Sequence, residues 1–100
     1  AAHIYDRVAV MSELHRQRAL AGKATLLVDL GKLESALALF EILRAEQPDD
    51  LDVAEGRARA LAELGRTDEA TAEYRRFVAL ATSRSDLRVR AALLWINAHG

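Results

Sequence analysis

The chain has 100 residues, a net charge of −1 and no cysteine. This length allows one domain, the missing cysteines exclude a disulfide framework and thiolate metal sites, and the near-neutral charge gives no global basic field for nucleic acid or an anionic membrane. Hydrophobic residues make up 51% of the chain, many of them alanine, and with only one proline this composition predicts an all-α protein.

The first predicted helix covers residues 3–15 and presents an apolar stripe on one face. The stripe consists of Ile4, Val8 and Met11. At about 100° per residue, the apolar face rotates by roughly half a turn between Met11 and Leu20. Either the chain breaks within residues 12–18, or one long helix serves two partners. We predict the break, with Ser12 as a candidate N-cap.

The next two predicted helices, residues 17–30 and 33–46, form a helix–turn–helix unit. Gly31 separates them, and glycine commonly ends a helix because it adopts a positive φ without a steric cost. Pro48 ends the unit because proline cannot continue a helix interior. One of the two aspartates that follow Pro48 is expected to cap the next helix.

A second helix pair follows at residues 51–64 and 67–81, with Thr67 as a candidate N-cap of its second helix. The two pairs share small residues, large apolar residues and a glycine, in the same order and 34 residues apart. The matches are Ala24 with Ala58, Leu27 with Leu61, Leu30 with Leu64, Gly31 with Gly65, Ala36 with Ala70, and Phe40 with Tyr74. The sequence therefore predicts two copies of one helix–turn–helix unit.

The last predicted helix, residues 86–98, continues the 34-residue spacing. The matched residues are Ala58 with Ala92 and Leu61 with Trp95. The apolar run at residues 91–96 places apolar groups on all sides of this helix, and such a helix is usually covered on more than one side. The expected cover is a second subunit, a bound partner or further chain. The candidate self-association residues are Leu94, Trp95 and Ile96.

This pattern resembles the tetratricopeptide repeat (TPR). The residues that carry the resemblance are Leu20, Ala24, Leu27, Gly31, Ala36, Phe40 and Pro48 in the first copy, and Ala58, Leu61, Gly65, Ala70 and Tyr74 in the second. The second copy departs from the family at Ala54, where a large residue is preferred, and at Thr82, where the closing proline is missing. The resemblance implies an all-α, TPR-like α-solenoid of five to six helices in antiparallel pairs. Its expected parts are an N-terminal helix at residues 1–16, repeats at 17–50 and 51–84, and a partial third repeat at 85–100.

In the TPR family, the first helix of each unit lines an inner face that usually holds a peptide. By resemblance, the inward positions here are Arg18, Ala21, Thr25, Val28, Asp29, Asp52, Glu55, Arg59, Ala62, Glu63, Val89, Leu93, Ile96 and Asn97. This mixture of charged and apolar groups suits an amphipathic helix or an extended segment. The lysine–asparagine set with which some TPR proteins clamp a C-terminal carboxylate is missing, because Ala21, Thr25, Gly56 and Asp86 stand at its places. Alternatively, the inward charges pair with one another across neighbouring helices.

Nothing in the chain resembles a catalytic, metal or cofactor motif. The three histidines, His3, His15 and His99, are scattered, and none is spaced from another histidine or a carboxylate as a metal pair on one helix face would be. There is no glycine-rich phosphate loop and no nucleophile elbow. Arginine is frequent in the second half, which raises RNA binding as an alternative, but interleaved aspartates and glutamates cancel most of that field.

The sequence thus predicts a non-catalytic protein–protein interaction module: a scaffold, adaptor or chaperone that binds a partner segment in its groove and self-associates through its terminal helices. The alternative from another class is the helical-repeat arm of a larger enzyme. RNA binding ranks below both. No run of 18 apolar residues is present to span a bilayer, and no signal peptide is visible. The composition favours the cytoplasm and fits a periplasm as well.

Overall fold

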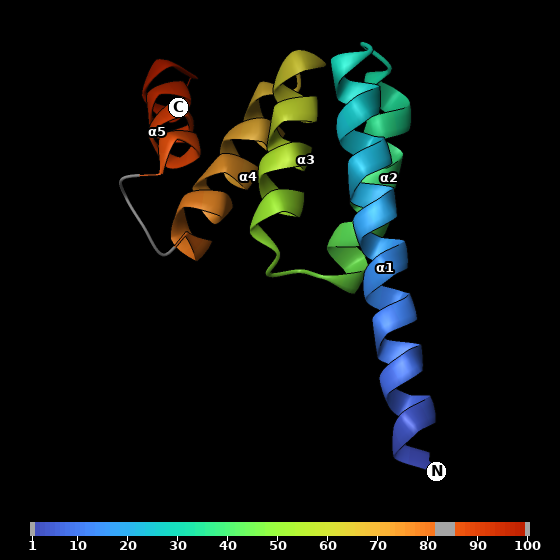
Figure 1. The fold of residues 1–100 in the computed structure, drawn as a ribbon. Helices are drawn as coiled ribbons and strands as arrows, with labels where there is room; N and C mark the ends of the chain where they lie inside the picture. The colour runs from blue at the N-terminus through green and yellow to red at the C-terminus, as the bar shows by residue number, and fades with distance from the viewer. Residues whose placement is uncertain (1, 82–85, 100) are drawn as a thin grey trace.

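The computed structural model describes the backbone of residues 2–81 and 86–99 and the side chains of residues 12–81 and 86–99. Five α-helices follow one another, and these ranges contain no β-strand (Figure 1). The helices are α1 (Ala2–Asp29), α2 (Leu33–Glu46), α3 (Leu51–Glu63), α4 (Thr67–Leu80) and α5 (Leu87–His99). Because the four helices after α1 begin and end within one residue of their predicted bounds, the all-α prediction is confirmed.

The first helix corrects one prediction. α1 runs without interruption from Ala2 to Asp29, and Ser12 lies inside it, so the predicted break is wrong. A break would have left unpaired backbone groups at two new helix ends. Residues 2–21 contain neither proline nor glycine, so no residue in this stretch forces the helix to end. Figure 1 shows that the first half of α1 extends beyond the other four helices.

The turns inside the two helix pairs are nearly identical. Gly31 and Gly65 have φ values of 79° and 81°, the left-handed conformation that glycine adopts most readily. After each glycine, the next amide reaches back to the helix: Lys32 N–H donates to the Leu27 carbonyl at 2.8 Å, and Arg66 N–H to the Leu61 carbonyl at 3.0 Å. This is the Schellman arrangement, which satisfies the last carbonyl groups of a helix. Its recurrence confirms that the two units share one turn.

Small and large apolar residues fill the interior at matched positions. The buried residues shared by both units are Ala24 and Ala58, Ala36 and Ala70, and Leu43 and Phe77. Phe40 and Tyr74 each contact the first helix of the following unit, Phe40 at Gly56 in α3 and Tyr74 at Trp95 in α5. Phe40 is buried, whereas Tyr74 is only half-buried, because no helix follows α5 among the described residues to cover it.

The start of α5 departs from the predicted spacing. α3 begins at Leu51 and α5 begins at Leu87, 36 residues later, although Ala58 and Ala92, which are matched at a spacing of 34, are both buried. The N-cap residues Asp50 and Asp86 are also 36 residues apart. The Asp50 carboxylate accepts from two amides at the start of α3, and the Asp86 carboxylate accepts from the Arg88 amide at 2.8 Å. The connection between α4 and α5 is therefore longer than the one between α2 and α3, and α5 begins later in its unit than α3 does.

The predicted N-cap of α4 is also wrong. Thr67 is the first residue of the helix, and the N-cap position belongs to Arg66, whose side chain makes no capping hydrogen bond. Lys32, the matching residue of the first unit, occupies the same place with nearly the same backbone angles. The Schellman turn sets the path of the chain here, so α2 and α4 begin directly after it without a side-chain cap.

Candidate functional site

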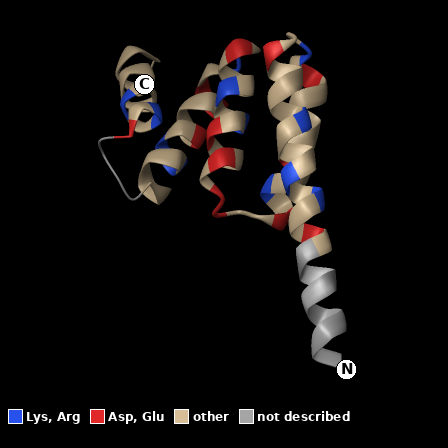
Figure 2. Cartoon of the chain, in the orientation of Figure 1, with Lys and Arg blue, Asp and Glu red and all other residues tan. Residues whose placement is uncertain are grey.

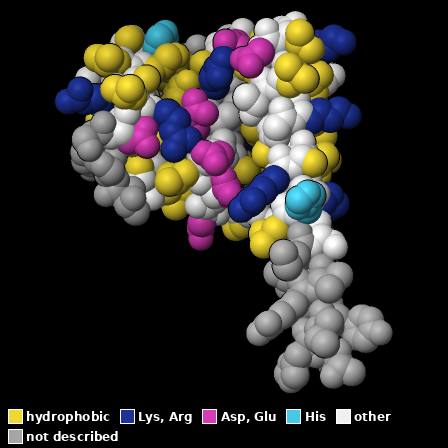
Figure 3. All heavy atoms as spheres, in the orientation of Figure 1, with side chains coloured by type: hydrophobic (Ala, Val, Ile, Leu, Met, Phe, Trp, Pro, Cys, Tyr) yellow, Lys and Arg dark blue, Asp and Glu magenta, His cyan; other side chains and the backbone are white. Residues whose placement is uncertain are grey.

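The exposed side of α1, α3 and α5 forms one continuous surface, which we call the inner face. In Figure 1, α1 lies in front of α2 and α3 lies in front of α4, and α5 follows beside α4. Acidic and basic residues both occur along α3 in Figure 2, and Figure 3 shows their side chains mixed over the middle of the inner face. The predicted groove residues that are exposed here are Arg18, Thr25, Asp29, Asp52 and Glu63, and those that are half-buried are Glu55, Arg59 and Leu93.

Two ion pairs connect the three helices across this face. Arg59 of α3 lies 3.1 Å from Asp29 of α1, and Arg88 of α5 lies 2.6 Å from Asp52 of α3. The hydrogen bond from Asp52 raises the pKa of Arg88 above its usual value, although burial acts in the opposite direction. For these two pairs, the alternative that inward charges pair across neighbouring helices is the observed arrangement. Each pair is exposed and contributes about 0–1 kcal/mol to stability.

Two carboxylates of α3 remain without such a partner among the described side chains: Glu55 and Glu63. Glu55 is half-buried, and this burial raises its pKa. The charges of Arg59 and Arg88 oppose the shift, and those of Asp52 and Asp86 add to it. The two arginines thus lower the energy of the Glu55 carboxylate only through space, since each is bonded to an aspartate.

A family model for the tetratricopeptide repeat matches residues 22–85, which is more than half of the chain. The chain belongs to the tetratricopeptide repeat family. The match begins within α1 and extends past α4, so it covers both matched turns. TPR repeats generally mediate protein–protein interactions. Comparisons with curated proteins and with solved structures found no match.

Two predicted groove residues do not lie on the inner face of this TPR chain. Val28 and Val89 are only 5% and 0% exposed and belong to the hydrophobic core. Val28 packs with Ala24 at the contact between α1 and α2. Val89 belongs to the buried cluster that also contains Ala54, Phe77 and Ala92, so it packs toward α3 and α4. Their assignment to the groove is therefore corrected.

A hollow lies on the inner face between α1 and the start of α3. Arg18 and Leu14 border it on one side, and Asp52 on the other. The amide of Gln47 donates a hydrogen bond to the buried amide oxygen of Gln17 at 2.5 Å and so ties α1 to the turn before α3. The sequence analysis missed this pair, because neither glutamine belongs to a recurring TPR position.

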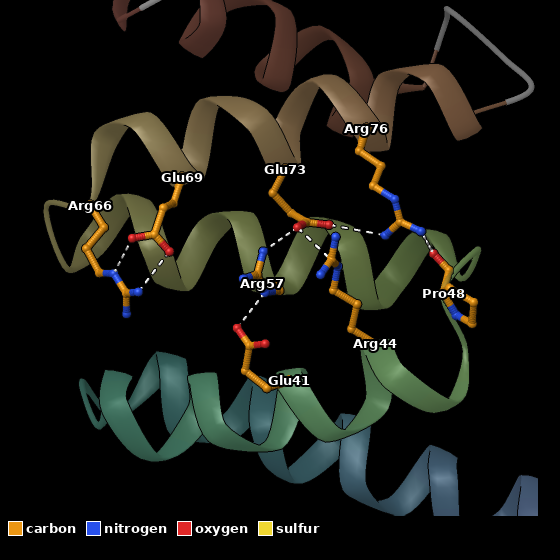
Figure 4. A network of polar contacts seen from close by, with 8 residues as sticks. All are labelled: Glu41, Arg44, Pro48, Arg57, Arg66, Glu69, Glu73 and Arg76. Atoms are coloured by element: carbon orange, nitrogen blue, oxygen red, sulfur yellow. Dashed lines mark hydrogen bonds and ion pairs between the residues drawn. The ribbon is translucent and has the colours of Figure 1, made fainter.

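A second charged cluster on the opposite side of the TPR units was also missed (Figure 4). Glu73 of α4 is only 3% exposed and accepts a hydrogen bond from Arg57 of α3. Arg44 of α2 and Arg76 of α4 reach the same carboxylate at 3.5 and 3.4 Å. Burial alone would lower the pKa of Arg57, but its bond to Glu41 and the charge of Glu73 more than offset this, and the pKa is raised. We call these residues the Glu73 network.

The arginines considered for RNA binding are mostly engaged with carboxylates. Those with a paired carboxylate are Arg57, Arg59, Arg66, Arg76 and Arg88. Arg84 lies outside the described residues. Pairing of this kind removes the excess positive charge that a phosphate backbone requires.

The end of the TPR array, α5, is only partly covered. Trp95 is half-buried, with its ring centroid 5.1 Å from that of Tyr74 and 4.2 Å from that of His99. Ile96 is also half-buried, whereas Leu94 is 70% exposed and Leu87, which the sequence analysis did not single out, is 77% exposed. Of the three predicted self-association residues, Leu94 alone is fully on the surface.

The described residues offer neither a metal-binding cluster nor a membrane-spanning helix. They contain no group of three or more histidine, cysteine or acidic side chains placed to hold a metal ion. None of the described helices combines the length and the apolar character needed to cross a membrane.

Proposed function

We propose that this TPR chain is a non-catalytic scaffold, adaptor or chaperone that binds a segment of a partner protein along its inner face. The observation that carries the proposal is the pair of cross-helix ion pairs, Asp29–Arg59 and Asp52–Arg88. They link the first helices of successive units, which the buried core already holds side by side, so the face exists before the partner arrives. Preorganisation of this kind lowers the entropy cost of binding.

The chemistry of the face favours a partner segment with both apolar and charged residues. Leu93 is half-buried, whereas Arg18, Thr25 and Glu63 are exposed. Apolar contacts would contribute affinity, and charges would set the register and the choice of partner.

A panel of phage-displayed random peptides tests this proposal. Peptides selected on the wild-type chain are expected to lose binding to an Arg18→Glu/Thr25→Arg variant, because both changes alter exposed side chains of the inner face. The matched control is Arg75→Glu/Ala79→Arg, which makes the same charge change at exposed positions of α4. Circular dichroism checks that both variants remain helical. Peptides that bind all three chains equally would move the binding site away from the inner face.

We also propose that α5 contacts a second copy of the chain. Leu87 and Leu94 support this, since two large apolar side chains are exposed on the helix that ends the array. Arrays of this type usually need three or more repeats for stability, and a second copy would extend the stack. Light scattering is expected to show a dimer or larger assembly that a Leu94→Glu change dissociates. A monomer at high concentration would contradict this part of the proposal.

The two alternatives make separate predictions. An RNA-binding repeat would be retained on heparin at moderate salt, whereas the paired arginines predict elution at low salt. If the chain is the arm of a larger enzyme, the natural polypeptide carries a catalytic domain, and its full length distinguishes the two cases.

A further inference from the structure

The junction of α3 and α5 combines carboxylates with aromatic rings. Glu55 and Glu63 lie two turns apart on α3, while Tyr74 of α4 and Trp95 of α5 place their rings 5.1 Å apart. Tyr74 packs against the buried cluster that contains Ala54, the residue before Glu55. Burial raises the pKa of Tyr74, and the charges of Glu55 and Glu63 raise it further, against the effect of Arg59. We call Glu55, Glu63, Tyr74 and Trp95 the acidic–aromatic patch.

The two carboxylates of the patch form no ion pair among the described side chains. The nearest cations, Arg59 and Arg88, each form an ion pair with an aspartate and not with Glu55. A half-buried carboxylate without a hydrogen bond has lost part of its hydration and gained no partner, which costs stability. Such costs are often found where a ligand later supplies the missing partner.

The charged groups of the inner face carry a net negative charge. Its carboxylates are Asp29, Asp52, Glu55, Glu63 and Asp86, and its guanidinium groups are Arg18, Arg59 and Arg88. Five acidic groups against three basic groups leave a surplus of negative charge, so charge complementarity favours a basic partner.

We propose that the acidic–aromatic patch receives a lysine or arginine side chain from an amphipathic, basic partner segment. The aromatic rings would contact the aliphatic stem of that side chain, and the carboxylates would pair with its cationic head. This inference rests on the proposed function of the inner face and specifies the chemistry of its partner.

The chain contains its own reporter for a test, because Trp95 is its only tryptophan. The probes are three synthetic 14-residue peptides that share one pattern of charged and uncharged positions. The charged and uncharged residues are Lys and Leu in the Lys/Leu peptide, Glu and Leu in the Glu/Leu peptide, and Lys and Ser in the Lys/Ser peptide. The Lys/Leu peptide is expected to change the emission of Trp95 and to bind at least tenfold more tightly than the other two. The Glu/Leu peptide tests the sign of the charge, and the Lys/Ser peptide tests whether charge suffices without apolar contact.

Two double variants that remove the same amount of charge distinguish binding at the acidic–aromatic patch from attraction by the overall negative charge of the chain. Glu55→Gln/Glu63→Gln is expected to weaken Lys/Leu binding at least tenfold. Glu34→Gln/Asp68→Asn removes the same charge at exposed positions of α2 and α4 and is expected to change binding less than twofold. Equal losses in both variants, no binding of the Lys/Leu peptide, or equally tight binding of the Glu/Leu peptide would overturn the proposal.

Failure here is distinguishable from failure of the proposed function. If phage-selected peptides depend on Arg18 and Thr25 but bind the Glu55→Gln/Glu63→Gln variant as tightly as wild type, the inner face is a binding site and the patch is not. If the selected peptides respond to neither set of changes, the inner-face proposal fails as well.

Discussion

Glu73 and Glu55 are two glutamates in one small helical array, yet their surroundings differ in kind. Glu73 is almost fully buried and is contacted by three arginines. Glu55 is half-buried, and the arginines nearest to it are bonded elsewhere. A satisfied buried carboxylate fixes how helices pack, whereas an unsatisfied one raises the energy of the free protein and remains available for a partner.

The two faces of the array differ accordingly. The Glu73 network joins α2, α3 and α4 on one side, where the Glu73 carboxylate pairs with arginines from all three helices (Figure 4). On the inner face, two exposed ion pairs hold the helices and leave Glu55 and Glu63 unpaired among the described side chains. The same residue types therefore pair with one another on one side of the molecule and remain partly unpaired on the other.

The largest expected effect tests the structural side. Glu73→Gln removes the charge that three guanidinium groups share and is expected to lower the free energy of unfolding by about 2–3 kcal/mol, somewhat less than for a fully buried pair because Arg44 and Arg76 reach solvent. Urea denaturation measures the change. The control is Glu69→Gln on the same helix, whose exposed pair with Arg66 contributes about 0–1 kcal/mol. Similar losses for both variants would show that the Glu73 network has no special role.

The next effect concerns the packing of the two units against each other. Gly56→Ala would place a Cβ atom against the buried ring of Phe40, and the resulting shift is expected to cost about 1–2 kcal/mol despite the better helix propensity of alanine. Gly22→Ala is the matched control, because its Cβ meets no neighbouring atom and the residue is exposed within α1. Thermal unfolding should show Gly22→Ala stabilised by about 0.5–1 kcal/mol. Stabilisation of both variants would mean that Phe40 moves freely.

The equivalence of the two turns predicts a smaller effect. Gly31→Ala and Gly65→Ala each force alanine into a left-handed conformation, at a cost of about 1 kcal/mol. Because the φ angles and hydrogen bonds match, the two losses measured by urea denaturation should agree within about 0.5 kcal/mol. Clearly unequal losses would show that the units are not energetically equivalent.

The smallest effect is a pH dependence at Glu55. Groups of three elements face this carboxylate: Asp52 and Arg59 of α3, Asp86 and Arg88 of the α5 segment, and Tyr74 of α4. Its pKa is higher in the folded than in the unfolded chain, so its contribution to stability is present below the usual value of 4.5 and is lost as the pH rises through the folded value.

Glu55→Gln should therefore be more stable than wild type at pH 7, by a few tenths of a kcal/mol, since a half-exposed group keeps much of its hydration. The difference should shrink as the pH falls through the raised pKa of Glu55. Unfolding curves at several pH values measure it. A difference that grows toward acid pH would reverse the sign of the assigned shift.

The repeat was predictable from the sequence because its determinants are local. Gly31 and Gly65 specify the turns, and alanines such as Ala36 and Ala70 specify close approach of helices. These residue types recur at one spacing, so their positions alone predict the helix pairs. The later start of α5 within its unit could not be predicted in this way, because the length of the connection after Leu80 follows no repeat.

The site was less predictable than the fold. Most charged residues of the inner face follow from the family pattern, but Val28 and Val89 were misplaced, since burial depends on how neighbouring helices rotate. The Glu73 network joins three helices, and its members occupy surface positions in any single-helix pattern. Interactions of this kind depend on tertiary distances, which the order of residues does not reveal.

The contrast between the two glutamates is tested most directly by measuring the free energy of unfolding of Glu55→Gln and Glu73→Gln side by side in urea at pH 7. The account predicts opposite signs: loss of the Glu55 charge stabilises the chain, and loss of the Glu73 charge destabilises it. Destabilisation by both substitutions would mean that Glu55 already has its partners within the chain and would contradict the assignment of the acidic–aromatic patch as a binding surface.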